Sequence, residues 1–157
     1  MKILLAYDGS DQARAALEEI VRRPWPRDTE VRVVTVIEPP FLAMTLGGDF
    51  QGPALAEVET MVRREATQRL RRAVKRLAVR EDLKATSEIR DGSPRRVLLE
   101  VARSWGADLV FAGSRGVGPV GEAILGSVSH ALVSHAPCGV EIVKTASTPP
   151  AAERRPG

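Results

Sequence analysis

The chain has 157 residues, 43% hydrophobic and 27% charged, which is enough for one globular domain with a buried core and too few for two. Its 23 basic and 20 acidic residues leave a net charge of only +3, which argues against a nucleic-acid partner, and the single Cys138 excludes an intramolecular disulfide. No run approaches the roughly 20 apolar residues of a membrane-spanning helix, and no targeting segment is recognised, so we expect a cytoplasmic protein without a membrane partner.

The first part of the chain predicts a strand, a helix and a second strand. The apolar run 3–7 stops at Asp8, where a tight turn and a helix start are expected. Pro24 ends this helix, and the β-branched run 31–37 has the length of a buried strand. The residues that recur at helical spacing and should face the core are Ala13, Ala16, Leu17, Ile20 and Val21.

A proline- and glycine-rich connection, 38–53, leads to a long helix at about 54–79. The apolar residues of the connection could form a lid or partner surface, or pack over the edge of the sheet, and both interpretations stay open. The helix is rich in arginine, but no aromatic residues interleave, so we interpret the cations as a solvated face. The residues expected to face the core are Val58, Val62, Ala66, Leu70, Ala73, Val74 and Leu77.

Three further strands are expected at 85–89, 108–112 and 140–143. The tail 145–157 is expected to be disordered, because proline, alanine and charged residues dominate it. Strands that alternate with helices predict a doubly wound α/β domain, in which right-handed crossovers cover both faces of a parallel sheet.

Two helices separate these three strands. The first should begin with Ser93 as its cap and Pro94 in its first position, and should leave through Gly106 in the left-handed conformation. The second should begin at Gly126 and end near Ser134. The buried stripe of the first helix is expected to consist of Val97, Leu98, Val101 and Ala102.

A ligand is expected where the first and fourth strands end, because the winding direction would reverse between them. Asp8 follows the first strand, and a glycine-rich loop begins at Gly113 after the fourth. Glycines let backbone N–H groups approach anionic oxygens, and the helix start at 126–129 should offer further free N–H groups. The glycine spacings within 116–127 also approximate a dinucleotide fingerprint and a Walker A loop, but neither has the required context.

Gly113, Gly116 and Gly126 are separated by two and nine residues, and the chain opens with the strand and turn of segment 2–10. This combination resembles the universal stress protein family over residues 1–144, leaving the tail uncovered. The resemblance implies a Rossmann-like sheet of five parallel strands in the order 3-2-1-4-5, with ATP, alone or with Mg²⁺, across the switch point. It also implies a homodimer formed through the strand at 139–144.

The resemblance further implies a role for each matching residue. Asp8 and the backbone near Ala6 and Val36 would hold adenine and ribose, and the glycines and serines would hold the phosphates. Arg115 could clamp a phosphate or be simply solvated, and both interpretations stay open. The expected nucleotide-binding residues are Ala6, Asp8, Val36, Gly113, Ser114, Arg115, Gly116, Gly126, Ser127, Val128 and Ser129.

The leading functional hypothesis is an ATP-dependent switch or sensor in stress-response signalling, without catalytic residues or a protein metal site. A second is a slow ATPase or phosphotransferase, in which Asp8 helps to hold Mg²⁺ and Ser127 or Ser129 accepts phosphate. A third is a protein-interaction module that works through the loop 39–52, with a nucleotide that is merely structural. His130 and His135 have no partner at catalytic spacing and are expected to be structural.

Overall fold

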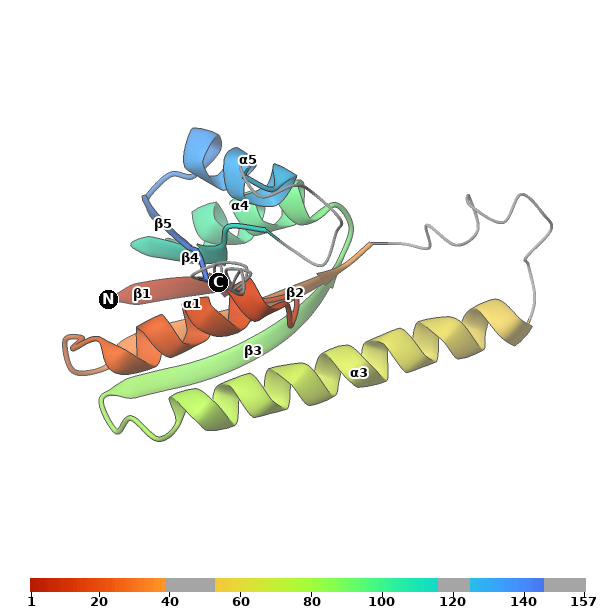
Figure 1. Cartoon of the computed structure of the whole chain (residues 1–157), viewed down its shortest axis with the longest axis horizontal. Helices are drawn as coiled ribbons and strands as arrows, with labels where there is room; N and C mark the ends of the chain where they lie inside the picture. Colours follow the sequence, from red (N-terminus) through yellow and green to blue (C-terminus); the bar gives the residue numbers. More distant parts are fainter. Residues whose placement is uncertain (39–52, 116–124, 146–157) are drawn as a thin grey trace, which may run out of the picture.

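Strands and helices alternate along the chain and build one sheet with helices on both faces (Figure 1). The structure is a computed structural model that describes residues 1–38, 53–115 and 125–145. The predicted loop 39–52, Gly116 and almost all of the predicted disordered tail lie outside these residues. The elements are β1 (Lys2–Ala6), α1 (Asp11–Arg22), β2 (Thr29–Ile37), α3 (Pro53–Leu77), β3 (Leu83–Asp91), α4 (Pro94–Trp105), β4 (Leu109–Gly113), α5 (Ser127–His135) and β5 (Gly139–Val143).

The sheet has the order β3-β2-β1-β4-β5, and all four neighbouring pairs are parallel. This confirms the predicted doubly wound fold and places the reversal of winding between β1 and β4. The carboxyl ends of these two strands therefore meet at one edge of the sheet.

Two hydrophobic cores lie on opposite faces of the sheet because side chains along each strand alternate. On the face covered by α1 and α3, Ile3 and Leu5 are fully buried together with Phe111, whose ring meets Trp25 edge-to-face at 6.0 Å. On the face covered by α4 and α5, Leu4 packs in the second core, to which Cys138 adds a half-buried contact. Burial raises the pKa of the Cys138 thiol. All the core residues predicted for α1 and α4 are buried.

The second and third strands are longer than predicted. They pair continuously from Thr29 with Leu83 to Ile37 with Asp91. Apolar patterning missed the first two residues of β2 and two residues at each end of β3, and all of these except Leu83 are polar. β3 is an edge strand, and charged side chains can point from it to solvent, as Lys84 and Arg90 do. The register of the neighbouring strand, rather than hydrophobicity, sets the length of such a strand.

Helix ends lie where the sequence signals predicted them, although one cap lacks its side-chain hydrogen bond. The Ala13 amide donates to the Ser10 hydroxyl at 3.2 Å, which caps α1, and Gly106 ends α4 in the left-handed conformation at a φ of 68°. Ser93 stands at the cap position of α4, as predicted, but its side chain makes no capping hydrogen bond. Pro94 occupies the start of the helix, as predicted, where its missing N–H costs no intrahelical hydrogen bond.

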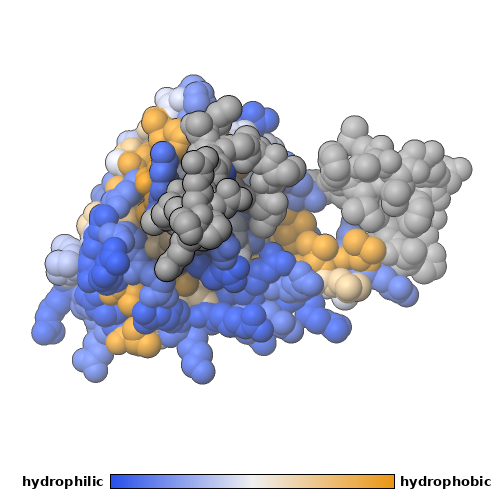
Figure 2. Space-filling model, in the orientation of Figure 1, coloured by the Kyte–Doolittle hydropathy of each residue, from blue (hydrophilic) through white to orange (hydrophobic). Residues whose placement is uncertain are grey.

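The long helix α3 is only partly covered by the sheet. Ala66 and Leu70 are buried as predicted, as are Ala73 and Leu77, whereas the Val62 residue is 43% exposed and Val58 only half-buried. The prediction that both valines face the core is therefore wrong, because the first half of the helix extends past the sheet (Figure 1). Over the rest of α3 the visible surface is mostly hydrophilic (Figure 2), as expected for a solvated basic face.

Arg80, which follows α3, forms hydrogen bonds with the carboxyl-terminal end of α1. Its Nη1 donates at 2.5 Å to the carbonyl of Val21, in the last turn of α1, and at 2.9 Å to that of Arg23, the C-cap residue. Its Nη2 donates to the Asp82 carboxylate at 2.7 Å. The Arg80 guanidinium lowers the pKa of the Asp82 carboxyl by hydrogen bonding. Arg80 therefore connects two helices on the same face of the sheet through backbone groups that helices leave unsatisfied.

We expect Arg80→Ala to lower the free energy of unfolding by about 2 kcal/mol, because it removes charge-assisted hydrogen bonds to two carbonyls. Chemical denaturation measures the loss, and Arg71→Ala, on the exposed face of α3, should change stability by less than about 0.5 kcal/mol. Asp82 has its lowered pKa only in the folded state, so its contribution is present above its ordinary pKa and is lost as the pH falls below about 4. Equal effects of the two variants would contradict this role.

Candidate functional site

A cavity of about 390 Å³ lies at the carboxyl ends of β1, β2 and β4, where the winding reverses. Ligands in open α/β sheets bind in this position. Its size is that of a pocket for a small organic ligand. The lining residues are Ala6, Tyr7, Asp8, Ala13, Val34, Val36, Glu38, Pro94, Leu98, Ala112, Gly113, Arg115, Gly126, Ser127, Val128 and Ser129.

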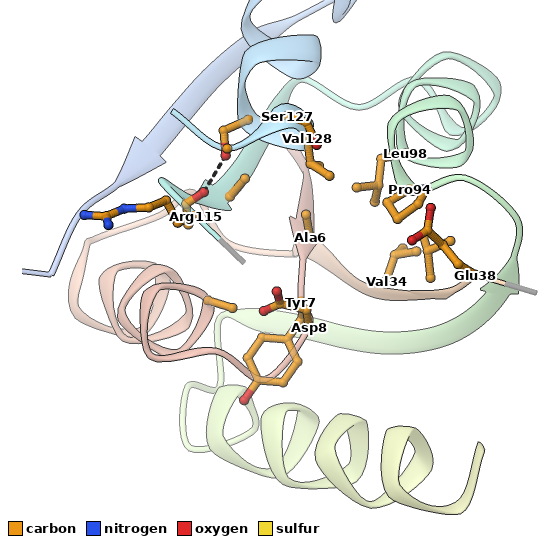
Figure 3. A pocket seen from close by; sticks show the side chains of 16 residues that line it. Ala6, Tyr7, Asp8, Val34, Glu38, Pro94, Leu98, Arg115, Ser127 and Val128 are labelled. Atoms are coloured by element: carbon orange, nitrogen blue, oxygen red, sulfur yellow. Dashed lines mark hydrogen bonds between the residues drawn. The ribbon is translucent and has the colours of Figure 1, made fainter. Parts of the chain in front are cut away.

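The two ends of the cavity differ in chemistry. Ala6 lies between them, with Ser127 and Val128 of α5 on one side and Leu98 and Val34 on the other (Figure 3). The second end, which Pro94 and Val36 complete, is lined mainly by apolar side chains. The first is formed by a helix start and the end of a strand. Such a cavity suits a molecule that is flat and apolar at one end and anionic at the other.

The helix start faces the cavity with unsatisfied amides. The first backbone hydrogen bond of α5 runs from the His130 amide to the Gly126 carbonyl at 2.9 Å, which leaves the amides of Ser127, Val128 and Ser129 without intrahelical acceptors. Together with the helix dipole, these amides favour an anion. The Gly126 amide is not free as expected, because it donates to the Ser114 carbonyl at 2.9 Å.

Gly113 and Ser129 join β4 to α5 beside the cavity. The buried Ser129 hydroxyl donates to the Gly113 carbonyl at 2.7 Å, so this donor is already used within the protein. A Cβ on Gly113 would lie only 2.5 Å from the Cβ of Gln12 and 2.9 Å from the backbone nitrogen of Ala13. The close approach of α1 therefore requires glycine here, whatever Gly113 contributes to a ligand.

Asp8 stands in the turn between β1 and α1. Its Oδ1 accepts a hydrogen bond from the Ser10 amide at 2.9 Å, and its carbonyl accepts one from Arg69 at 3.2 Å. Ser10 caps the helix itself, as predicted, so Asp8 serves the turn with one carboxylate oxygen and lines the cavity. Gly9 follows at a φ of 80° and packs against the Arg69 side chain, which fixes the direction of this turn.

Val36 places backbone groups at the apolar end of the cavity. The Val34 carbonyl accepts from the Tyr7 amide, and the Ile37 carbonyl accepts from the Gly92 amide beyond β3. Since alternate residues of a parallel strand bond to opposite neighbours, the N–H and C=O of Val36 point to the β1 side. The last pair between these strands is Ala6 with Val34, so the Val36 groups lie beyond the paired part of β1.

The three remaining predicted residues differ in where they lie. Arg115 lines the cavity, but its side chain extends away from the other labelled residues (Figure 3). Ser114 is buried and is not among the lining residues; its amide donates to the Val143 carbonyl, and its carbonyl accepts from the Gly126 amide. Gly116 lies outside the described residues. Of the eleven expected residues, the cavity thus brings together all but these last two.

Several lining residues were not singled out from the sequence as site residues. Pro94 and Leu98 come from the first turns of α4, Val34 comes from β2, and Glu38 directly follows β2. The sequence held a usable signal, since every helix that follows a strand of a parallel sheet begins at the same edge as the ligand. Tyr7 also lines the cavity, but its phenol points toward α3 (Figure 3), and burial raises its pKa.

Across residues 1–38, 53–115 and 125–145, no three histidine, cysteine, aspartate or glutamate side chains are grouped as metal ligands would be. In the same part of the chain, no helix combines the length and the apolar character needed to cross a membrane. The described lining of the cavity thus consists of the backbone amides at the start of α5, apolar side chains, the carboxylate residues Asp8 and Glu38, and Arg115.

A family model and a related sequence both match this chain and name the same family. The family model described as "Universal stress protein family" matches residues 1–144. A universal stress protein of Thermus aquaticus is 33% identical over 144 residues, which are 90% of this chain and 97% of the relative.

Two solved structures share the fold. A universal stress protein family protein from Arabidopsis thaliana with AMP bound has a TM-score of 0.66 at 18% identity, covering 92% of this chain and 91% of its own. A universal stress protein in complex with cAMP has a TM-score of 0.59 at 22% identity, covering 92% of this chain and 97% of its own. At these identities the comparison supports the fold alone.

Proposed function

The chain belongs to the universal stress protein family, and from this we propose that its cavity binds an adenine nucleotide, with ATP as the ligand. The observation that carries the proposal is the pairing of an apolar end with a helix start in one cavity. Phosphate oxygens fit the amides of Ser127, Val128 and Ser129. A purine ring fits between Val36, Pro94 and Leu98.

Backbone and carboxylate groups would orient the nucleotide. The N–H and C=O of Val36 offer a donor and an acceptor to the adenine edge, which itself presents both. One oxygen of the Asp8 carboxylate accepts a hydrogen bond from the Ser10 amide. The other oxygen would accept hydrogen bonds from the ribose hydroxyls. The bound AMP and cAMP of the two structural relatives agree with an adenine nucleotide as the ligand class.

We propose that binding, rather than turnover, is the function, and that the loaded and empty forms act as a switch in stress-response signalling in the cytoplasm. A ligand can act in this way only if it binds one form of the protein more tightly than another. Support for the proposal comes from the lining of the cavity, because a nucleotide there would contact β1, β2, α4 and α5 at once.

Isothermal titration calorimetry of nucleotide-stripped protein with ATP, AMP, cAMP and adenosine tests the proposal. We expect saturable binding that Asp8→Asn weakens by about tenfold, since asparagine can keep the Ser10 hydrogen bond but loses the charge. Asp11→Asn is the matched control, because Asp11 is an exposed residue of α1 that does not line the cavity.

Three outcomes would contradict parts of the proposal. Folded wild-type protein that binds none of the four compounds would exclude the nucleotide site. Rapid release of phosphate from ATP in the same samples would favour the ATPase hypothesis over the switch. Equal losses in Asp8→Asn and Asp11→Asn would show that Asp8 does not hold the ligand.

We also propose that two copies assemble through β5, as the family resemblance implies. Support comes from the position of β5 at the edge of the sheet, where it pairs with β4 on one side only. An edge strand of this kind is a template for pairing with another chain unless it is covered or blunted. Sedimentation velocity over a dilution series measures the assembly directly.

A further inference from the structure

An acidic residue stands at the centre of the edge strand β5. Glu141 is the third of the five residues Gly139–Val143. A charge in the middle of an edge strand is a common device against pairing with other chains. In this protein, however, the charge is already matched by a residue from another element.

The Arg23 guanidinium, at the end of α1, binds the Glu141 carboxylate with both of its terminal nitrogens. Nη1 donates to Oε2 at 2.6 Å, Nη2 donates to Oε1, and Nε donates to Glu19 at 2.8 Å. The Glu141 side chain is 29% exposed and that of Arg23 38%. A bidentate pair of this kind holds both side chains in one place. Arg23 thus connects α1 to the edge strand.

The backbone of β5 restricts how a second copy can pair with it. The Val143 carbonyl accepts from the Ser114 amide, so the backbone groups of residues 139, 141 and 143 point to β4, and those of Val140 and Ile142 point outward. A two-fold antiparallel arrangement centred on residue 141 uses both outward-facing residues and pairs all five residues of the strand.

In that arrangement Glu141 stands directly opposite Glu141 of the second copy. Two such residues form a pair without mutual hydrogen bonds, with Cα atoms about 4.5 Å apart. Like charges placed directly opposite each other destabilise a sheet. The two carboxylates would therefore oppose the dimer unless each carried its own counter-charge.

We infer that Arg23 is the residue that makes β5 competent to pair with a second copy, by neutralising Glu141 at the two-fold axis. The inference rests on the proposed homodimer and goes beyond it, since it names the register and the residue that permits it. Arg23 acts through Glu141, so it is a specificity-determining residue of the interface. Without it, Glu141 blunts the edge.

Sedimentation velocity over a dilution series, with circular dichroism to confirm folding, tests the inference on the full chain. We expect Arg23→Ala to weaken dimerisation at least tenfold, and Arg23→Ala/Glu141→Gln to restore the wild-type dissociation constant within threefold. Arg22→Ala is the matched control, because the neighbouring Arg22 pairs with Glu19 and not with Glu141. It should leave the dimer unchanged.

A cross-link tests the register independently. In Cys138→Ser/Glu141→Cys the introduced thiols of two copies should form a disulfide under mild oxidation, because their Cα atoms lie within bonding range. In Cys138→Ser/Lys144→Cys the thiols would not be opposite each other, and no cross-link is expected. The chain's only native cysteine is removed in both.

The outcomes separate this inference from the dimer itself. Wild-type protein that stays monomeric at high concentration overturns the dimer and the inference with it. A wild-type dimer that Arg23→Ala leaves intact, or that the double variant fails to restore although folded, overturns the inference alone. A cross-link through residue 144 but not 141 overturns the register.

Discussion

Replacing Gly113 by alanine is expected to lower the free energy of unfolding by about 3 kcal/mol or more. A Cβ at this position would lie 2.5 Å from the Gln12 Cβ and 2.8 Å from the Gln12 carbonyl carbon. The backbone of α1 cannot move aside as a flexible side chain can, so α1 has to shift away from β4. Differential scanning calorimetry should show a melting temperature lower by roughly 6–12 °C.

Gly139→Ala is the matched control, since Gly139 begins the neighbouring strand β5. Its Cβ would lie 3.1 Å from Leu109 Cδ1, the end of a side chain that can turn away. A loss of less than about 1 kcal/mol is therefore expected there. Similar losses in the two variants would contradict the packing role of Gly113.

A loss of nucleotide binding in Gly113→Ala would have two possible causes. Because Gly113 both lines the cavity and contacts α1, a binding defect in Gly113→Ala follows from a displaced helix as readily as from a lost phosphate contact. Substitution of Gly113 is thus a poor test of the nucleotide site. A test has to fill the cavity without moving its walls.

The second large effect is expected from Ala6→Phe, which should weaken nucleotide binding at least 100-fold, or about 2.7 kcal/mol. Ala6 ends β1 and lies between the apolar end of the cavity and the start of α5 (Figure 3). A benzyl group there would occupy the space through which a nucleotide must extend from one end to the other. Calorimetric titration with ATP measures the loss.

Two controls accompany this variant. Ala6→Ser keeps the side chain small and should bind ATP within threefold of the wild type. Thr86→Phe adds a large apolar side chain at an exposed position of β3, away from the cavity, and should not affect binding. If folded Ala6→Phe bound ATP as tightly as wild type, the nucleotide would have to lie elsewhere on the protein.

The order of strands and helices was predictable from the sequence alone, because each element carries a local signal. Helical spacing identified the buried faces of α1 and α4, and Ser10 and Gly106 marked helix ends. The nine candidate residues that line the cavity were predictable as a group, since a parallel sheet brings the carboxyl ends of β1 and β4 to one edge.

Only the tertiary structure decided what these residues do to one another. Local patterning could not show that Gly113 touches α1, that the Gly126 amide is taken by the Ser114 carbonyl, or that Val62 extends beyond the sheet. Arg23 and Glu141 are 118 residues apart in the chain. Their pairing depends on how α1 lies over the sheet, and contacts between distant segments leave no periodic trace in a sequence. The sequence therefore determined which elements form and which edge of the sheet holds the site, while packing determined which donors and charges remain available there.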